Sequence, residues 1–123
     1  MLARANRIVR ADDYKNTVRR GRKTTTAHCV VYVRTGRHSG PPRFGFIVAK
    51  TVGNAVVRNT VRRRLKGVAH ELLSSSEHPV LWEGTDVVIR SLPGSIEVPW
   101  SSLLQEITGV VGKGVSSSKE TTS

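Results

Sequence analysis

Residues 53–67, GNAVVRNTVRRRLKG, concentrate positive charge in a way that suits binding to a polyanion. The stretch carries five cationic side chains in fifteen positions and no acidic one. Arginine presents a planar fork of N–H donors that matches two oxygens of a phosphate group. Such contacts release counterions from a nucleic acid and add affinity that is independent of base sequence. The chemistry expected of these residues is therefore phosphate binding.

Helical spacing predicts that the cations share one side of a helix over residues 54–73. On a wheel of about 100° per residue, an apolar stripe is formed by Val57, Val61, Leu65, Val68 and Leu72. The adjacent arc carries Arg58, Asn59, Arg62, Arg63 and Lys66. Like charges at i,i+4 spacing repel, and within this helix no acid precedes Glu71. A solvated face would mix charge signs, so the pattern favours a bound anion over a solvated face. Arg64 lies on the other side of the stripe.

The charge of the whole chain points to the same kind of partner. Its 123 residues carry a formal net charge of +11. Residues 1–23 hold eight cations and two acids, residues 50–66 hold six cations and no acid, and the remainder is close to neutral. A polyanion is the natural inference. A membrane surface is the competing anion, but the apolar face of 54–73 lacks the aromatic residues typical of membrane helices.

The acidic residues and histidines do not indicate a catalytic centre. The nine acids are scattered, and only Asp12 and Asp13 adjoin. A nuclease that holds its own metals needs carboxylates that converge on the scissile phosphate. The histidines show no metal-ligand spacing, and there is no phosphate-loop motif. The pattern indicates a protein that contacts an anion while the chemistry occurs elsewhere.

Features that would place the chain outside the cytoplasm are missing from the sequence. Cys29 is the single cysteine and cannot form an internal disulfide. No apolar run approaches the roughly 20 residues needed to span a bilayer. The N-terminus lacks the apolar stretch of a secretory signal. We expect a cytoplasmic protein.

The elements that position these side chains are expected in the order α-β-β-α-β-α. Helices are predicted over 11–20, 54–73 and 99–111, and strands over 27–34, 43–50 and 85–91. The first two strands are expected to form a hairpin with a long connection. The fold class is a small α/β or α+β two-layer sandwich, with a mostly antiparallel sheet packed against helices. A single domain is expected over 1–111 and a disordered tail over 112–123.

Aromatic residues on the predicted sheet allow two interpretations. Strand alternation places Val30, Tyr32 and Arg34 on one face of the strand 27–34. With Tyr14 nearby, this face could stack unpaired bases. Alternatively, both tyrosines are core residues whose hydroxyls reach solvent. The pattern does not decide between the two.

Residues 48–66, VAKTVGNAVVRNTVRRRLK, closely resemble the signature of the bacterial ribonuclease P protein subunit. The matching positions are Gly53, Asn54, Ala55, Val56, Arg58, Asn59, Arg62, Arg63 and Lys66. Arg7, Asp13 and Tyr14 match the N-terminal part of the family, and coverage extends over about residues 2–111.

The resemblance implies a fold in which the basic helix joins two parallel strands through a left-handed crossover, against the usual rule. It also implies an RNA-based endoribonuclease that removes the 5′ leader of precursor tRNA. The catalytic RNA would hold the metal ions, normally Mg²⁺, and the protein would bind that RNA and the leader. No membrane and no obligate protein partner is expected.

Carried over residue by residue, the resemblance implies two sets of contacts. The RNA-binding set is Lys50, Asn54, Arg58, Asn59, Arg62, Arg63 and Lys66. The leader-binding cleft is lined by Arg7, Tyr14, Val18, Val30, Tyr32, Ile47 and Ala49. Val18 replaces a common second aromatic, and Ile47 and Ala49 replace common serines, so a more apolar cleft is expected.

Three other classes of protein share part of this pattern. A ribosomal protein or RNA chaperone would have the same charge and size, and it would leave leader cleavage unchanged. A DNA-binding module could insert the 54–73 helix into a major groove, but no companion helix precedes it. A metal nuclease would cleave RNA without an RNA subunit.

Overall fold

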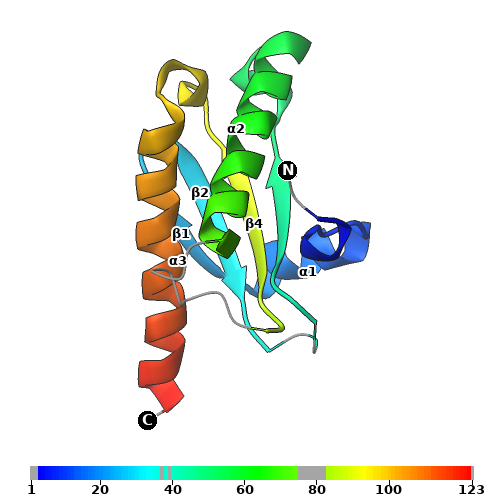
Figure 1. Cartoon of the computed structure of the whole chain (residues 1–123), viewed down its shortest axis with the longest axis vertical. Helices are drawn as coiled ribbons and strands as arrows, with labels where there is room; N and C mark the ends of the chain where they lie inside the picture. Colours follow the sequence, from blue (N-terminus) through cyan, green and yellow to red (C-terminus); the bar gives the residue numbers. More distant parts are fainter. Residues whose placement is uncertain (1–2, 37, 39, 75–82, 123) are drawn as a thin grey trace.

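A four-stranded mixed sheet forms the centre of the computed structural model, which describes residues 3–36, 38, 40–74 and 83–122, with side chains through Val111. The strand order is β1-β2-β4-β3. The strands are β1 (Arg22–Thr25), β2 (Cys29–Arg34), β3 (Arg43–Ile47) and β4 (Asp86–Ser91). Helices α2 (Ala55–Ser74) and α3 (Trp100–Thr122) cover one face, and α1 (Ala11–Arg20) covers the other (Figure 1). The predicted α+β class is confirmed, but helices lie on both faces of the sheet, so there are three layers instead of the predicted two.

The pairing of β4 corrects one prediction and confirms another. β4 lies between β2 and β3, antiparallel to the first and parallel to the second. The predicted hairpin of the first two long strands is therefore wrong, because a strand distant in sequence pairs with both. In Figure 1, β3 and β4 run upward, α2 descends in front of the sheet, and β4 lies to the left of β3. The crossover through α2 is therefore left-handed, as the resemblance implies.

Strand β1 was not predicted from the sequence. It pairs antiparallel with β2, with Arg22 opposite Val33 and Thr25 opposite Val30. Its residues are polar and largely exposed, so they show no apolar alternation. The Thr24–Thr26 run of β-branched residues was the available signal.

The predicted alternation of the strands is confirmed by two separate apolar clusters. The larger one lies under α2 and α3 and contains Val31, Phe44 and Ile89 from the sheet. The smaller one lies under α1 and contains Ile8, Val30, Tyr32 and Val88. From α2, the larger cluster takes the buried stripe of Val61, Leu65, Val68 and Leu72. Burial of that stripe leaves the other side of α2 in solvent.

Helix α3 is longer than predicted. The sequence predicts a helix that ends at residue 111 and a disordered tail after it, whereas the structure continues the helix through Thr122. Glycine costs about 1 kcal/mol relative to alanine in a helix and does not forbid one. No proline follows Pro99 in the chain. In the part of the chain that the structure describes, neither this helix nor any other has the length and apolar character of a membrane span.

Glu106 ties α3 to the turn between β1 and β2. Its Oε1 accepts hydrogen bonds from the Thr26 hydroxyl at 2.7 Å and the His28 backbone N–H at 2.9 Å. Its Oε2 lies 2.7 Å from His28 Nδ1. Burial by itself raises the pKa of Glu106, but the hydrogen bonds from His28 and Thr26 outweigh it and lower the pKa below its ordinary value of 4.5.

We expect this carboxylate to make folding stability depend on pH. A lowered pKa in the folded state gives stabilisation that is present above the ordinary value and lost as the pH falls through the lowered one. At neutral pH, Glu106→Gln should cost about 1.5–3 kcal/mol, the range for hydrogen bonds to a charged group. Urea unfolding over a pH series should show the two proteins converge as the pH falls below about 4.5. A constant difference at every pH would contradict the assignment.

Candidate nucleic-acid interface

Asn54 caps the basic helix. Its side-chain Oδ1 accepts a hydrogen bond from the Val57 backbone N–H at 3.0 Å. This satisfies one of the N–H groups that the first turn leaves without an intrahelical partner. The resemblance assigns Asn54 to RNA binding, and the structure shows its side chain engaged in capping. Lys50 lies just before it in the short turn η2 (Lys50–Val52) and is exposed.

The basic face of α2 is a preorganised cationic surface, which we define as Arg58, Asn59, Arg62, Arg63 and Lys66. Asn59 Oδ1 accepts a hydrogen bond from Arg62 Nη1 at 3.1 Å and so orients that guanidinium. A hollow of about 650 Å³ on this side is lined by Asn59, Arg62, Arg63, Lys66 and Gly67. Within the described residues, no carboxylate forms an ion pair with a cation of this face. The structure thus brings together five residues of the predicted RNA-binding set.

Arg64 has a structural role instead. Its Nη1 donates hydrogen bonds to the backbone carbonyls of Ile96 at 2.8 Å and Val98 at 3.2 Å. The prediction that Arg64 lies off the basic face is confirmed. The contact holds the segment that precedes α3 against α2.

The N-terminal segment and α1 cover the outer edge of β3. The Ile8 backbone N–H donates to the Phe44 carbonyl at 2.9 Å. The Tyr14 hydroxyl accepts a hydrogen bond from the Phe46 backbone N–H at 3.3 Å. An edge strand presents unpaired backbone groups that need such partners. These contacts bring the Tyr14 hydroxyl to the edge of β3, while the ring packs with the apolar cluster under α1.

A groove of about 250 Å³, which we call the α1 groove, is lined by Tyr14, Lys15, Val18, Arg19 and Ile47. It contains three of the residues predicted for the leader cleft: Tyr14, Val18 and Ile47. Lys15 and Arg19 were missed. They are spaced i,i+4 in the same way as Tyr14 and Val18, one position along the helix, and this spacing was the signal that could have found them.

The other predicted cleft residues lie elsewhere. Val30 and Tyr32 are 7% and 6% exposed and belong to the apolar cluster under α1. Tyr32 is therefore a core residue, while Tyr14 is half-buried with its ring at the groove. Ala49 is half-buried and lines none of the hollows described here. Arg7 lies outside the α1 groove.

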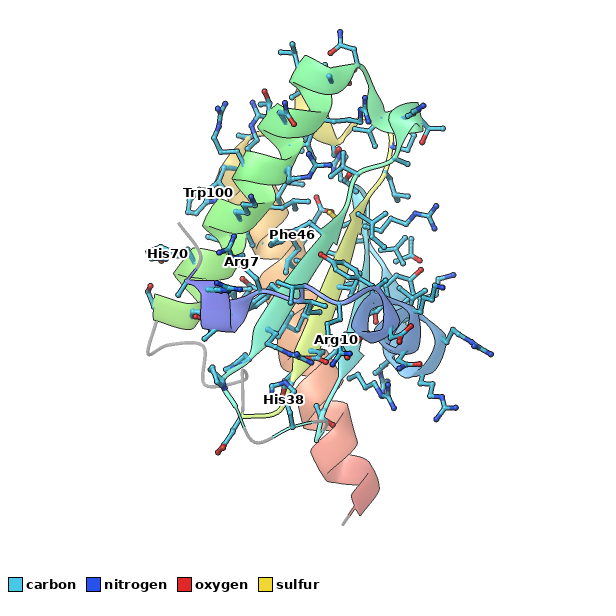
Figure 2. All side chains as sticks on the ribbon, turned by 90° about the vertical axis from the view of Figure 1, so that its right-hand side faces the viewer. Arg7, Arg10, His38, Phe46, His70 and Trp100 are labelled. Atoms are coloured by element: carbon cyan, nitrogen blue, oxygen red, sulfur yellow. The ribbon has the colours of Figure 1, made fainter. Side chains whose placement is uncertain are left out.

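A third hollow joins the α1 groove to the basic face. Its volume is about 240 Å³, and it is lined by Arg7, Ile8, Val9, Tyr14, Phe44, Phe46, Arg62 and Lys66. We call it the junction. It shares Tyr14 with the α1 groove, and Arg62 and Lys66 with the hollow on α2. Figure 2 shows Arg7 on the segment that crosses in front of β3, and Phe46 between β3 and α2. One continuous surface therefore runs around the edge of β3.

We expect Gly45→Ala to disturb this surface. A Cβ at position 45 would lie 2.5 Å from Tyr14 Cε1 and 2.7 Å from Tyr14 Cζ, so the ring would have to move away from β3. The Phe46 N–H would then lose its hydrogen bond to Tyr14. We expect the free energy of unfolding to fall by about 1–3 kcal/mol, the usual cost of overpacking. Urea unfolding measures this loss.

Gly109→Ala in α3 is the matched control, because a Cβ there meets no atom within 4 Å. Alanine is the better helix former, so this control should be unchanged or slightly stabilised. Equal destabilisation by the two substitutions would contradict the close packing of Tyr14 on Gly45.

The described residues offer anion contacts and little that could perform catalysis. Burial raises the pKa of the Cys29 thiol to about 12, and the nearby Glu106 charge adds to the effect, so the sulfur stays protonated and unreactive. Asp86 and Glu106 are engaged by neighbouring side chains. Among the residues that the structure describes, no group of three acids, histidines or cysteines could hold a metal ion.

This fold and surface define a small α+β protein with a polyanion-binding face. The family model described as Ribonuclease P matches residues 2–114. A ribonuclease P protein component from Clavibacter michiganensis is 49% identical over 115 residues, covering 94% of this chain and 97% of that protein. One from Beutenbergia cavernae is 41% identical, covering 89% and 87%. The solved RNase P protein from Thermotoga maritima has the same fold, with a TM-score of 0.70 at 18% identity, covering 87% of this chain and 96% of that one.

The chain belongs to the bacterial ribonuclease P protein family. Members of this family are the protein subunit of the RNA-based endoribonuclease that removes the 5′ leader from precursor tRNA. The protein therefore acts in tRNA processing together with ribonuclease P RNA, which carries the catalytic centre.

Proposed function

We propose that the basic face of α2 binds the catalytic RNA and that the α1 groove receives the leader of precursor tRNA. The observation that supports this arrangement is that the three hollows share lining residues, so that one continuous surface runs from Tyr14 to Lys66. Phosphates suit the cationic end, because arginine binds them in bidentate fashion. Unpaired bases suit the end with Tyr14, because every base has a face that stacks on an aromatic ring.

The groove is expected to bind the leader largely without base selection. Val18 and Ile47 offer apolar contact, and the flanking Lys15 and Arg19 can reach backbone phosphates. Direct base readout needs paired donors and acceptors at a base edge, which apolar side chains do not supply. We propose leader binding through stacking and charge.

We further propose that the Mg²⁺ ions of the reaction are held by the RNA, and that the protein works in the cytoplasm, where bacterial precursor tRNA is made. The described residues support the first point, because among them no group of three acids, histidines or cysteines could hold a metal ion. Asp86 accepts hydrogen bonds from Arg43, and Glu106 accepts them from Thr26 and His28. This chain would aid metal binding indirectly, by neutralising phosphates that crowd together in the folded RNA.

Cleavage of 5′-extended precursor tRNA by cognate ribonuclease P RNA at low Mg²⁺, with and without the protein, tests the proposal. Cleavage at the mature 5′ end should be restored only when both subunits are present. Tight RNA binding without restored cleavage would support a general RNA chaperone instead. Cleavage by the protein alone would overturn the placement of the chemistry on the RNA.

Affinity of the reconstituted enzyme for substrates with and without a leader tests the α1 groove separately. The leader should increase affinity with the unaltered protein, and the increase should shrink when Tyr14→Ala removes the aromatic ring. Lys23→Ala on β1 is the control, because that exposed side chain lies at the opposite edge of the sheet. An unchanged leader effect with Tyr14→Ala would remove the groove from the leader path.

A further inference from the structure

Trp100 is a large aromatic residue that lies outside the apolar core. It begins α3 and is 37% exposed, whereas Leu103 and Ile107 of the same helix are fully buried. It belongs to neither apolar cluster of the sheet. A tryptophan left at the surface of a small protein is a common anchor for a partner, because its ring buries a large area at little entropic cost.

Gly67 of α2 provides the place where Trp100 rests. A Cβ built at position 67 would lie 3.0 Å from Trp100 Nε1 and 3.5 Å from Cδ1, so the indole edge contacts the glycine. Gly67 also lines the hollow of the basic face. Figure 2 shows Trp100 on the outer side of α2, away from Phe46 and β3. The indole therefore lies against Gly67 of the cationic hollow without lining the hollow itself, on the side of α2 opposite the junction.

Arg64 keeps the tryptophan in this position. Its two hydrogen bonds to the carbonyls of Ile96 and Val98 fix the backbone just ahead of Trp100. Arg63, one helical turn before Gly67, is exposed and belongs to the basic face. Proteins bind unpaired bases of single-stranded RNA with an aromatic ring in a fixed position beside cations that are not paired with carboxylates.

We propose that Trp100 stacks on an unpaired base of the RNA bound by α2, as a second aromatic contact distinct from Tyr14. The cations of the basic face would bind the phosphates around that nucleotide. The basic face then lies between two aromatic sites, with Tyr14 toward the leader and Trp100 toward the catalytic RNA. This inference rests on the proposed binding of the catalytic RNA by α2.

Fluorescence of Trp100 tests the proposal without altering that residue. The chain has two tryptophans, so Trp82→Phe leaves Trp100 as the sole strong fluorophore. Titration with ribonuclease P RNA should quench its emission and protect it from acrylamide, with free N-acetyltryptophanamide as the control for light absorbed by RNA. RNA binding that leaves emission and acrylamide access unchanged would overturn the inference and leave the proposed function standing. Absence of RNA binding would overturn both.

Substitutions at Trp100 separate stacking from packing. In the Trp82→Phe protein, Trp100→Leu should weaken RNA binding about 10-fold, within the range for loss of one base–aromatic stack. Trp100→Phe should retain most of the affinity. The salt dependence should be unchanged in both, whereas Arg63→Gln should reduce its slope by about one. Thermal unfolding identifies any loss of folded protein, and equal affinities for the Leu and Phe variants would contradict stacking.

Discussion

Charge reversal of Arg62 and Arg63 to glutamate is expected to weaken binding to ribonuclease P RNA by about 100-fold or more. Each arginine is expected to lose a charge-assisted hydrogen bond worth about 1.5–3 kcal/mol, and a factor of ten corresponds to about 1.4 kcal/mol. Arg62 has the larger expected share, because Asn59 orients it and it lines both the junction and the hollow on α2. Affinity measured over a salt series should also show a shallower slope, reduced by about 1.5–2 for two lost phosphate contacts.

The matched control is charge reversal of Arg22 and Lys23 on β1. These side chains are exposed at the sheet edge farthest from β3, and the double substitution changes the net charge by the same amount. It should lower affinity only modestly, through the general field of the protein. Equal losses for the two double variants would mean that net charge, rather than the basic face, determines binding. An unaltered slope for the α2 variant would contradict phosphate contact at these residues.

Asp86→Asn is expected to cost about 3 kcal/mol of folding stability, the lower end of the range for breaking a buried ion pair. The Asp86 side chain is 5% exposed, and its two oxygens accept hydrogen bonds from Arg43 Nε and Nη2, both at 2.8 Å. His38 Nε2 lies 2.9 Å from Asp86 Oδ1. His38 Nδ1 accepts from the Gly40 N–H at 3.1 Å, so Nε2 carries the proton that is donated to Asp86.

The expected loss of folding stability comes from the hydrogen-bond donors that would no longer have Asp86 as their acceptor. An asparagine would point N–H donors at Arg43 or His38, which are donors themselves, so the donor that it faces would lose its acceptor. The hydrogen bond with Asp86 raises the pKa of Arg43, and this contribution is lost in the variant. The guanidinium stays charged even so, because arginine is not deprotonated in proteins. Because 24% of the Arg43 side chain reaches solvent, the loss should stay at the lower end of the range.

Urea unfolding measures the effect, with Asp13→Asn as the control. Asp13 also faces Arg43, but at 3.5 Å and with 29% of its side chain exposed. Such a pair is worth at most about 1 kcal/mol. Equal losses for the two substitutions would mean that the buried position of Asp86 carries no special weight.

Local patterns in the sequence were sufficient for several features of the site. The stripe of Val61, Leu65 and Val68 predicted which side of α2 is buried, because helical periodicity depends only on neighbours within two turns. The same geometry predicted that Arg64 lies off the basic face. Alternation along β2 predicted the two faces of the sheet, because side chains of a strand alternate with a period of two.

Pairings between distant segments were decided only by the tertiary structure. No local pattern shows that β4 enters between β2 and β3, because strand order depends on how α2 packs across the sheet. The packing of the helices on both faces of the sheet brings Tyr14 of α1 to Gly45, buries Tyr32 under α1, and joins the α1 groove to Arg62 and Lys66 of α2. It also sets Trp100 on Gly67, where two helices meet. The sequence by itself determined that α2 presents cations to a polyanion, because the positive charges and their helical spacing lie within one short stretch. The neighbours of those cations were decided only by the tertiary structure, because they come from segments far apart in the chain.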